Sequence, residues 1–188
     1  HWLGGMGVLV LTAALLPFLG ISSNHLIRAE SPGPVKSKLL PRASQSSKIL
    51  YAIYLALTAV EAVLLRLAGL GWYDAVTHAM STAGTGGFSR MNASVGAFGS
   101  PAVEIIITVF MLLFSVNFAV YFLILTGKAR QALKSDELRF FLIMVALATA
   151  AIAWNIRDLY QGVGECVRYA AFQVASIVST TGFSSANY

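Results

Sequence analysis

The chain has 188 residues, of which 57% are hydrophobic and only 11% are charged. Soluble domains carry roughly 25% charged residues, so this composition indicates an integral membrane protein. The net charge of +5 is not gathered on a soluble basic module, so we expect no nucleic-acid partner. A single cysteine, Cys166, and three scattered histidines exclude a disulfide framework and disfavour a metal centre. Because no nucleophile–base pair is apparent either, we expect neither an enzyme nor a bound cofactor.

Long apolar segments predict the membrane-spanning helices. A spanning helix needs ~20 apolar residues, and three segments are that long, while a fourth reaches it if Leu138 and Ile156 extend it. We expect each to be one continuous helix. The four segments are residues 3–21, 49–70, 103–125 and about 140–154.

Two further apolar stretches, residues 72–83 and 166–178, are too short to span. Their length, ~12 residues, is that of a re-entrant half-helix. Each follows a long helix and precedes a small polar loop, so the repeating unit is long helix, half-helix, loop, long helix. Such repeats usually surround a shared axis.

This unit predicts an all-α polytopic membrane protein. The chain begins without Met and inside an apolar segment, so we expect an internal fragment. The predicted parts are the last helix of a preceding repeat (1–22), a cytoplasmic linker (23–47), a complete repeat (48–126), a second cytoplasmic linker (127–136) and a truncated next repeat (137–188).

Basic residues predict the orientation. Five Lys and Arg residues lie in segment 28–48 and four in segment 128–139, whereas the loop-bearing sides carry far fewer. Cytoplasmic segments are enriched in Lys and Arg, so both basic segments are predicted to be cytoplasmic and both loops to face outside.

Two nine-residue stretches, 81–89 and 176–184, are nearly alike when one is shifted by 95 residues onto the other. Non-helical backbone is tolerated at membrane depth only where it is buried in protein or lines a water-filled path. Glycine lets a backbone carbonyl turn toward such a path, and rings of carbonyls can replace the hydration shell of a cation. Neither stretch contains a carboxylate. The matching positions are Ser81 and Ser176, Thr85 and Thr180, Gly87 and Gly182, Phe88 and Phe183, and Ser89 and Ser184.

We therefore interpret the loops as cation-binding pore loops. The half-helices strengthen this interpretation if their C-termini, which carry about −0.5 charge, point toward the ion. The alternative is a pair of ordinary turns at helix ends. A phosphate-binding loop is disfavoured because no Gly-Lys-Ser/Thr sequence follows either loop.

The sequences Trp2-Leu-Gly-Gly-Met-Gly7 and Arg28-Ala-Glu-Ser-Pro-Gly-Pro34, followed by two Gly-Phe-Ser loops, resemble the Trk/Ktr/HKT superfamily of potassium transport proteins. The bacterial Trk-type potassium uptake subunit is the most similar branch. The resemblance implies four helix–pore-loop–helix repeats around a pseudo-four-fold pore, about half of them present here. It also implies a cell inner membrane location, a homodimer, a cytosolic nucleotide-binding regulatory ring, and a gate in a broken helix after the third filter, beyond Tyr188.

The resemblance also implies a function for the loops as a potassium selectivity filter. Relatives with glycine in the filter favour potassium, and some plant relatives with serine favour sodium. When the repeats are aligned, Gly86 of the first loop matches Thr181 of the second, so the two loops are similar but not identical. The expected potassium-binding residues are Thr85, Gly86, Gly87, Thr180, Thr181 and Gly182, with filter support from Phe88, Ser89, Phe183, Ser184 and Asn117.

Four of the other polar residues and Asn117 are interpreted individually. Asn117, predicted in the middle of a helix, is interpreted as bonding a neighbouring helix or a loop backbone, with ion contact as the alternative. Glu61 is a functional-site candidate because acids are rare at membrane depth. Asp74, Asp158 and Glu165 are interpreted as solvated surface charge or as acids that concentrate cations outside. The alternative function is a secondary transporter of another cation or small solute that uses broken helices.

Overall fold

The computed structural model describes residues 1–4, 43–160 and 162–186, and these are helical or irregular with no strand among them. The predicted helix 3–21 from residue 5 onward, and the linker 23–47 up to residue 42, lie outside the described residues. The helices are α3 (Ala43–Leu67), α4 (Trp72–Ala83), the 3-10 helix η3 (Ser94–Phe98), α5 (Pro101–Ser115), α6 (Phe118–Leu125), α7 (Ala129–Leu133), α8 (Asp136–Asn155) and α9 (Val163–Val178).

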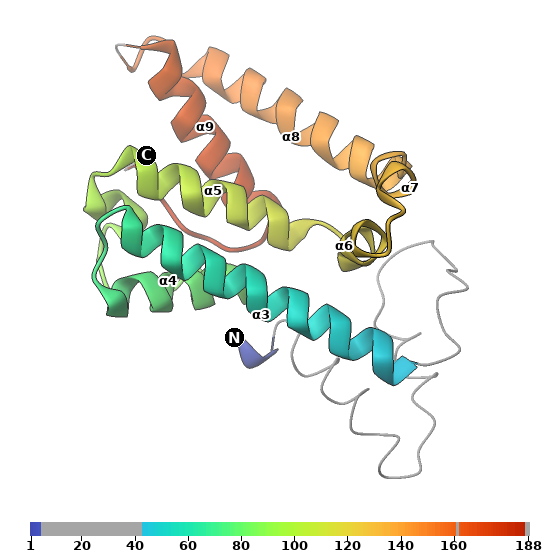
Figure 1. The fold of residues 1–188 in the computed structure, drawn as a ribbon. Coiled ribbons are helices and arrows are strands. Elements are labelled where there is room, and N and C mark those ends of the chain that lie inside the picture. Colours follow the sequence, from blue (N-terminus) through green and yellow to red (C-terminus); the bar gives the residue numbers. More distant parts are fainter. Residues whose placement is uncertain (5–42, 161, 187–188) are drawn as a thin grey trace.

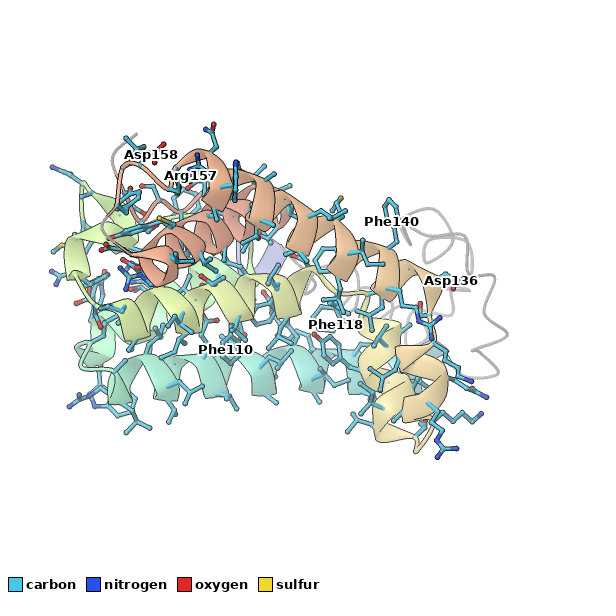
Figure 2. All side chains as sticks on the ribbon, turned by 90° about the horizontal axis from the view of Figure 1, so that it is seen from above. Phe110, Phe118, Asp136, Phe140, Arg157 and Asp158 are labelled. Carbon is cyan, nitrogen blue, oxygen red and sulfur yellow. The ribbon has the colours of Figure 1, made fainter. Side chains whose placement is uncertain are left out.

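Two of the helices are long and apolar enough to cross a membrane by themselves: the Ile49–Leu67 part of α3, and α8. Their apolar side chains are largely exposed, as expected of surfaces that meet lipid or further protein. Figure 2 shows Phe140 of α8 pointing away from the rest of the molecule, with 72% of its surface exposed. The two predicted spans 49–70 and 140–154 are thus present as helices.

The two predicted half-helices are also present. Helix α4 has 12 residues and α9 has 16, which at 1.5 Å per residue makes them roughly 18 Å and 24 Å long. Both are shorter than the hydrocarbon core of a bilayer, ~30 Å. Each ends at one of the two glycine loops, as the sequence predicts.

The prediction of one continuous helix over residues 103–125 is wrong. The chain forms α5 and α6, with an 89° bend between them. Val116 takes an extended conformation, and the side-chain oxygen of Asn117 accepts a hydrogen bond from the backbone N–H of Ala119 at 3.0 Å. Asn117 is therefore the cap of a new helix. Asparagine favours caps over helix interiors because its side chain competes for backbone groups, and hydropathy alone does not register this.

Helix α5 lies at the centre of the described structure. Figure 1 shows the α3–α4 pair on one side of α5 and the α8–α9 pair on the other. Ile107 and Met111 of α5 are fully buried in a cluster that also contains Phe172 and Ala175 of α9. In Figure 2, Phe110 lies between α5 and α3, where it belongs to a second cluster with Tyr54. The two repeats are thus packed on a shared helix, and this brings their loops together.

Candidate functional site

The first loop (residues 84–89) and the second loop (residues 179–184) leave their half-helices in the same way. The second residue after each helix end, Thr85 or Thr180, is left-handed, with φ of 50° and 58°. The backbone N–H of Gly86 donates to Ser81 O at 2.8 Å, and that of Thr181 donates to Ser176 O at 3.0 Å. These are matched Schellman caps, with threonine where glycine is usual.

A second left-handed residue follows in each loop, and here it is a glycine. Gly87 has φ of 64° and Gly182 has φ of 86°, while the residues between, Gly86 and Thr181, have no positive φ. An alternation of handedness lets successive carbonyl oxygens face a common side, which is the arrangement that a carbonyl-lined cation path uses. A turn that only ended a helix would need one left-handed residue rather than two.

Serine side chains inside the half-helices hold the loops in place. Ser81 Oγ accepts a hydrogen bond from the backbone N–H of Phe88 at 2.7 Å. At the matching position, Ser176 Oγ donates to the carbonyl oxygen of Phe183, also at 2.7 Å. The 95-residue shift of the sequence onto itself matched these two serines but predicted no function for them. Their hydroxyls close each loop back onto the last turn of its own helix.

The two loops contact each other. A side chain on Gly87 would overlap the carbonyl oxygen of Thr181, so this glycine allows a close approach of the backbones. Further along, the backbone N–H of Ser184 donates to Ser94 Oγ at 3.2 Å, and the N–H of Gly96 donates to Ser184 O at 3.2 Å. Helix η3, which follows the first loop, therefore binds the end of the second loop. Figure 1 shows the segment after α9 returning along α5 toward this end of the molecule.

The three acids that the sequence analysis interpreted as solvated surface charge do not all lie in solvent. Asp74 is buried and receives two hydrogen bonds from Arg90, the residue after the first loop. The Arg90 guanidinium lowers the pKa of Asp74, mainly through these bonds, and the carboxylate in turn raises the pKa of Arg90. Glu165 lies 3.6 Å from Arg168. Asp158, with 87% of its side chain exposed, and Glu165, with 41%, fit the description of solvated surface charge, whereas Asp74 does not.

A buried ion pair joins the two repeats. Arg168 of α9 lies 2.8 Å from Glu104, whose side chain at the start of α5 is 5% exposed. This pair was not predicted, because the two residues are far apart in the sequence. It holds the second half-helix against the central helix.

Three further predicted site residues have the following positions. Phe183 is 1% exposed, whereas Phe88 is 61% exposed and touches the ring of His1 edge-on at 4.9 Å. The side chain of Asn117 contacts Ala119 N and, at 3.5 Å, Glu137 Oε1, so these bonds lie at the α5–α6 break rather than in the loops. The interpretation of Asn117 as filter support stays a prediction.

Glu61 is fully buried on α3, which packs on α4. Among the described residues, no group of His, Cys, Asp and Glu side chains could hold a metal ion. The functional candidate is the backbone of the two loops, with its matched left-handed residues, and the groups that fasten it.

Comparison with known proteins shows the family to which the chain belongs. The family model described as "TrkH: Cation transport protein" matches residues 1–188. The chain belongs to this family of transport proteins. Its members transport ions rather than catalyse reactions, in agreement with the expected absence of an active site.

Individual relatives support the same conclusion. The chain is 40% identical to the Trk system potassium uptake protein TrkH of Halomonas elongata, over 100% of this chain and 40% of that protein. It is 37% identical to TrkH of Escherichia coli K12, over 98% and 39%. In the crystal structure of the potassium transporter TrkH from Vibrio parahaemolyticus, a similar fold covers 98% of this chain and 37% of that one, with a TM-score of 0.77 and 34% identity. The chain thus spans about two fifths of the length of these TrkH-family relatives.

Proposed function

We propose that this chain supplies two filter segments of a potassium-selective uptake pore. The carrying observation is the pair of loops that share two left-handed residues, at Thr85 and Gly87 and at Thr180 and Gly182, and that touch each other. Relatives named as potassium uptake proteins support potassium as the transported ion. Because the chain covers about two fifths of these relatives, conduction is proposed for the full-length protein.

The proposed ion ligands are backbone carbonyl oxygens of Thr85, Gly86 and Gly87 and of Thr180, Thr181 and Gly182. Carbonyl dipoles replace part of the ion's hydration shell without a full negative charge, so the ion binds and can leave again. Helices α4 and α9 both end at the loops. Their C-terminal ends carry about −0.5 charge each and favour a cation nearby.

The proposed topology follows from charge and composition. The basic segments 28–48 and 128–139 are placed on the cytoplasmic side of the inner membrane, and the filter loops face outside. The exposed apolar side chains of α8 then meet lipid or the remaining repeats. The homodimer and the cytosolic nucleotide-binding ring, which the family resemblance implies, are proposed as partners of the full-length protein.

The test replaces Gly182 by serine in the full-length protein and measures potassium and sodium uptake in cells that lack other potassium uptake systems. A β-carbon at Gly182 meets nothing within 4 Å, so the variant should fold while its strained backbone alters the carbonyl position. We expect the potassium-to-sodium uptake ratio to fall about tenfold. The matched control is Gly127→Ser, which has a similar φ of 79° and open space but lies outside the loops.

The control should keep the ratio of the unmodified protein, since it carries the same backbone strain away from the filter. An unchanged ratio in Gly182→Ser, at normal protein amounts in the membrane, would falsify the filter assignment. An equal loss in Gly127→Ser would attribute the effect to general strain and would also count against it.

A further inference from the structure

The side chain of His78, in the middle of α4, uses both ring nitrogens for hydrogen bonds. Nδ1 lies 2.8 Å from the carbonyl oxygen of Asp74, and Nε2 lies 3.0 Å from Ser89 Oγ. A carbonyl oxygen only accepts, so Nδ1 carries the proton and Nε2 of the neutral ring accepts from the Ser89 hydroxyl. Ser89 Oγ in turn accepts from the backbone N–H of Met91 at 3.1 Å. The ring thus ties the end of the first loop to its half-helix.

The same ring contacts the second loop. The rings of His78 and Phe183 are stacked, with centroids 5.7 Å apart and an angle of 21°. Phe98 of η3 packs edge-on against His78 at 5.2 Å, and η3 also binds Ser184 through Ser94 and Gly96. His78 is fully buried. One side chain therefore contacts the end of the first loop, the second loop, and the short helix that holds the second loop.

The repeat offers an internal comparison. Shifting by 95 residues places Gln173 at the position of His78. In the described part of the chain the side-chain oxygen of Gln173 is buried without a hydrogen-bond partner, and Ser184, the match of Ser89, is bound by η3 instead. The histidine bridge is therefore specific to the first repeat and is not a general feature of how these half-helices fold.

We propose that His78 is a positioning residue that fixes the outer ends of the two loops relative to each other and so sets the selectivity between potassium and sodium. This inference rests on the proposed filter function. Selectivity by carbonyl oxygens depends on how the oxygens are placed, and Ser89 and Phe183 lie within two residues of Gly87 and Gly182. Loss of the His78 contacts would therefore let Ser89 and Phe183 move, and the short chain segments that link them to the glycines would pass this movement on to the carbonyl oxygens.

The test uses the full-length protein and compares three variants with a control. His78→Phe keeps a ring that can stack on Phe183 but cannot bond Ser89, and Ser89→Ala removes the other partner of that bond. His78→Gln places an amide oxygen where Nε2 stood and can still accept from Ser89. Thr77→Val is the matched control: its hydroxyl bonds only to the backbone of Tyr73 and Asp74, within α4.

We expect the potassium-to-sodium uptake ratio, per amount of folded protein in the membrane, to fall about five- to tenfold in His78→Phe and Ser89→Ala, the scale of one hydrogen bond. His78→Gln should lower the ratio less than His78→Phe, because it keeps the bond to Ser89 and loses only the ring contacts with Phe183 and Phe98, and Thr77→Val should not change it. Because both variants break the same bond, Ser89→Ala should add little when His78 is already phenylalanine.

An unchanged ratio in both His78→Phe and Ser89→Ala overturns the proposal, as does a full additional effect of Ser89→Ala in the His78→Phe background. If His78→Phe fails to accumulate in the membrane, Ser89→Ala and His78→Gln decide the matter, since Ser89 is only partly buried. The Gly182→Ser variant separates the two proposals. If it alters the ratio while the His78 and Ser89 variants do not, the positioning function fails and the filter assignment stands.

Discussion

The first and second loops have the same backbone but are fastened by different neighbours. Besides the serine clamp that both loops share, the first loop and the residue after it are tied to their own half-helix at two places one turn apart, by His78 to Ser89 and by Asp74 to Arg90. Residues His1 and Trp2 pack behind it, where a side chain on Gly84 would meet Trp2 N at 2.8 Å. The preceding part of the chain therefore supports this loop.

The second loop is supported from within and from the first repeat. Ser179 and Thr181, which replace Gly84 and Gly86 of the first loop, join their hydroxyl groups at 2.6 Å. Phe183 is buried, whereas its match Phe88 is exposed. The features common to both loops, the left-handed residues and the serine clamps, are those that position carbonyl oxygens. The fastening varies because each loop has different neighbours, so variants at matched positions should separate shared from local features.

The largest expected effect is on the ion pair that anchors the second half-helix. Arg168→Met leaves the buried Glu104 carboxylate without its ionic partner. Breaking a buried ion pair in this way lowers the free energy of unfolding by about 3 kcal/mol. In the first repeat, Arg90→Met should destabilise less, because the Arg90 side chain is 57% exposed and water replaces part of its interaction. Unfolding of the purified full-length variants in detergent measures the difference.

The double variant Arg168→Met with Glu104→Gln serves as the control, since it removes the unpaired charge. It should recover a large part of the lost stability. Equal destabilisation by Arg168→Met and Arg90→Met would contradict the difference in burial on which the prediction rests.

The next effect compares the two filter glycines. Alanine at either position is left-handed, at a cost of roughly 1–2 kcal/mol. Gly87→Ala should cost more than Gly182→Ala, because only at Gly87 would the new methyl group overlap a backbone oxygen, that of Thr181. Thermal unfolding of both variants beside Gly127→Ala, which carries strain alone, gives the comparison. A Gly87 variant no less stable than the other two would mean that the loops do not approach as closely as the structure has them.

A smaller effect is expected from the serine clamps. Ser176→Ala leaves the buried carbonyl oxygen of Phe183 without its hydroxyl partner, for which we expect a loss of about 1–2 kcal/mol. Ser81→Ala removes the acceptor of the Phe88 N–H. Because Phe88 is exposed, water can bond this N–H instead, so the variant should lose less stability. Unfolding free energies of the two variants test this order. The reverse order would show that the Phe88 N–H needs its serine partner more than the Phe183 carbonyl oxygen does.

Much of the architecture follows from the sequence because its causes are local. Hydropathy and length predict α8 and the bounds of α4, and the shifted repeat predicts the matched loops around Gly87 and Gly182. The break at Asn117 was not predicted, since a capping residue inside an apolar run looks the same as a buried amide. The bridge of His78 and the pair of Glu104 with Arg168 depend on which repeats pack together, and no local pattern in one sequence records this. The potassium ligands themselves remain predictions of the proposed function.

The smallest expected effect is the pH dependence of the stability that the Asp74–Arg90 ion pair gives the first loop. Arg90 lowers the pKa of Asp74 below its ordinary value of 3.8, so this interaction stabilises the folded protein above that pH and is lost as the pH falls through the lowered pKa. Arg90→Gln returns the pKa of Asp74 toward its ordinary value. The stability difference between the unmodified protein and Arg90→Gln should therefore be constant near neutral pH and shrink below pH 3.8. Asp74→Asn with Arg90→Gln is the control, whose stability should lack this acid-dependent part. A difference that persists unchanged in acid would mean that Arg90 stabilises the first loop by packing rather than by its charge.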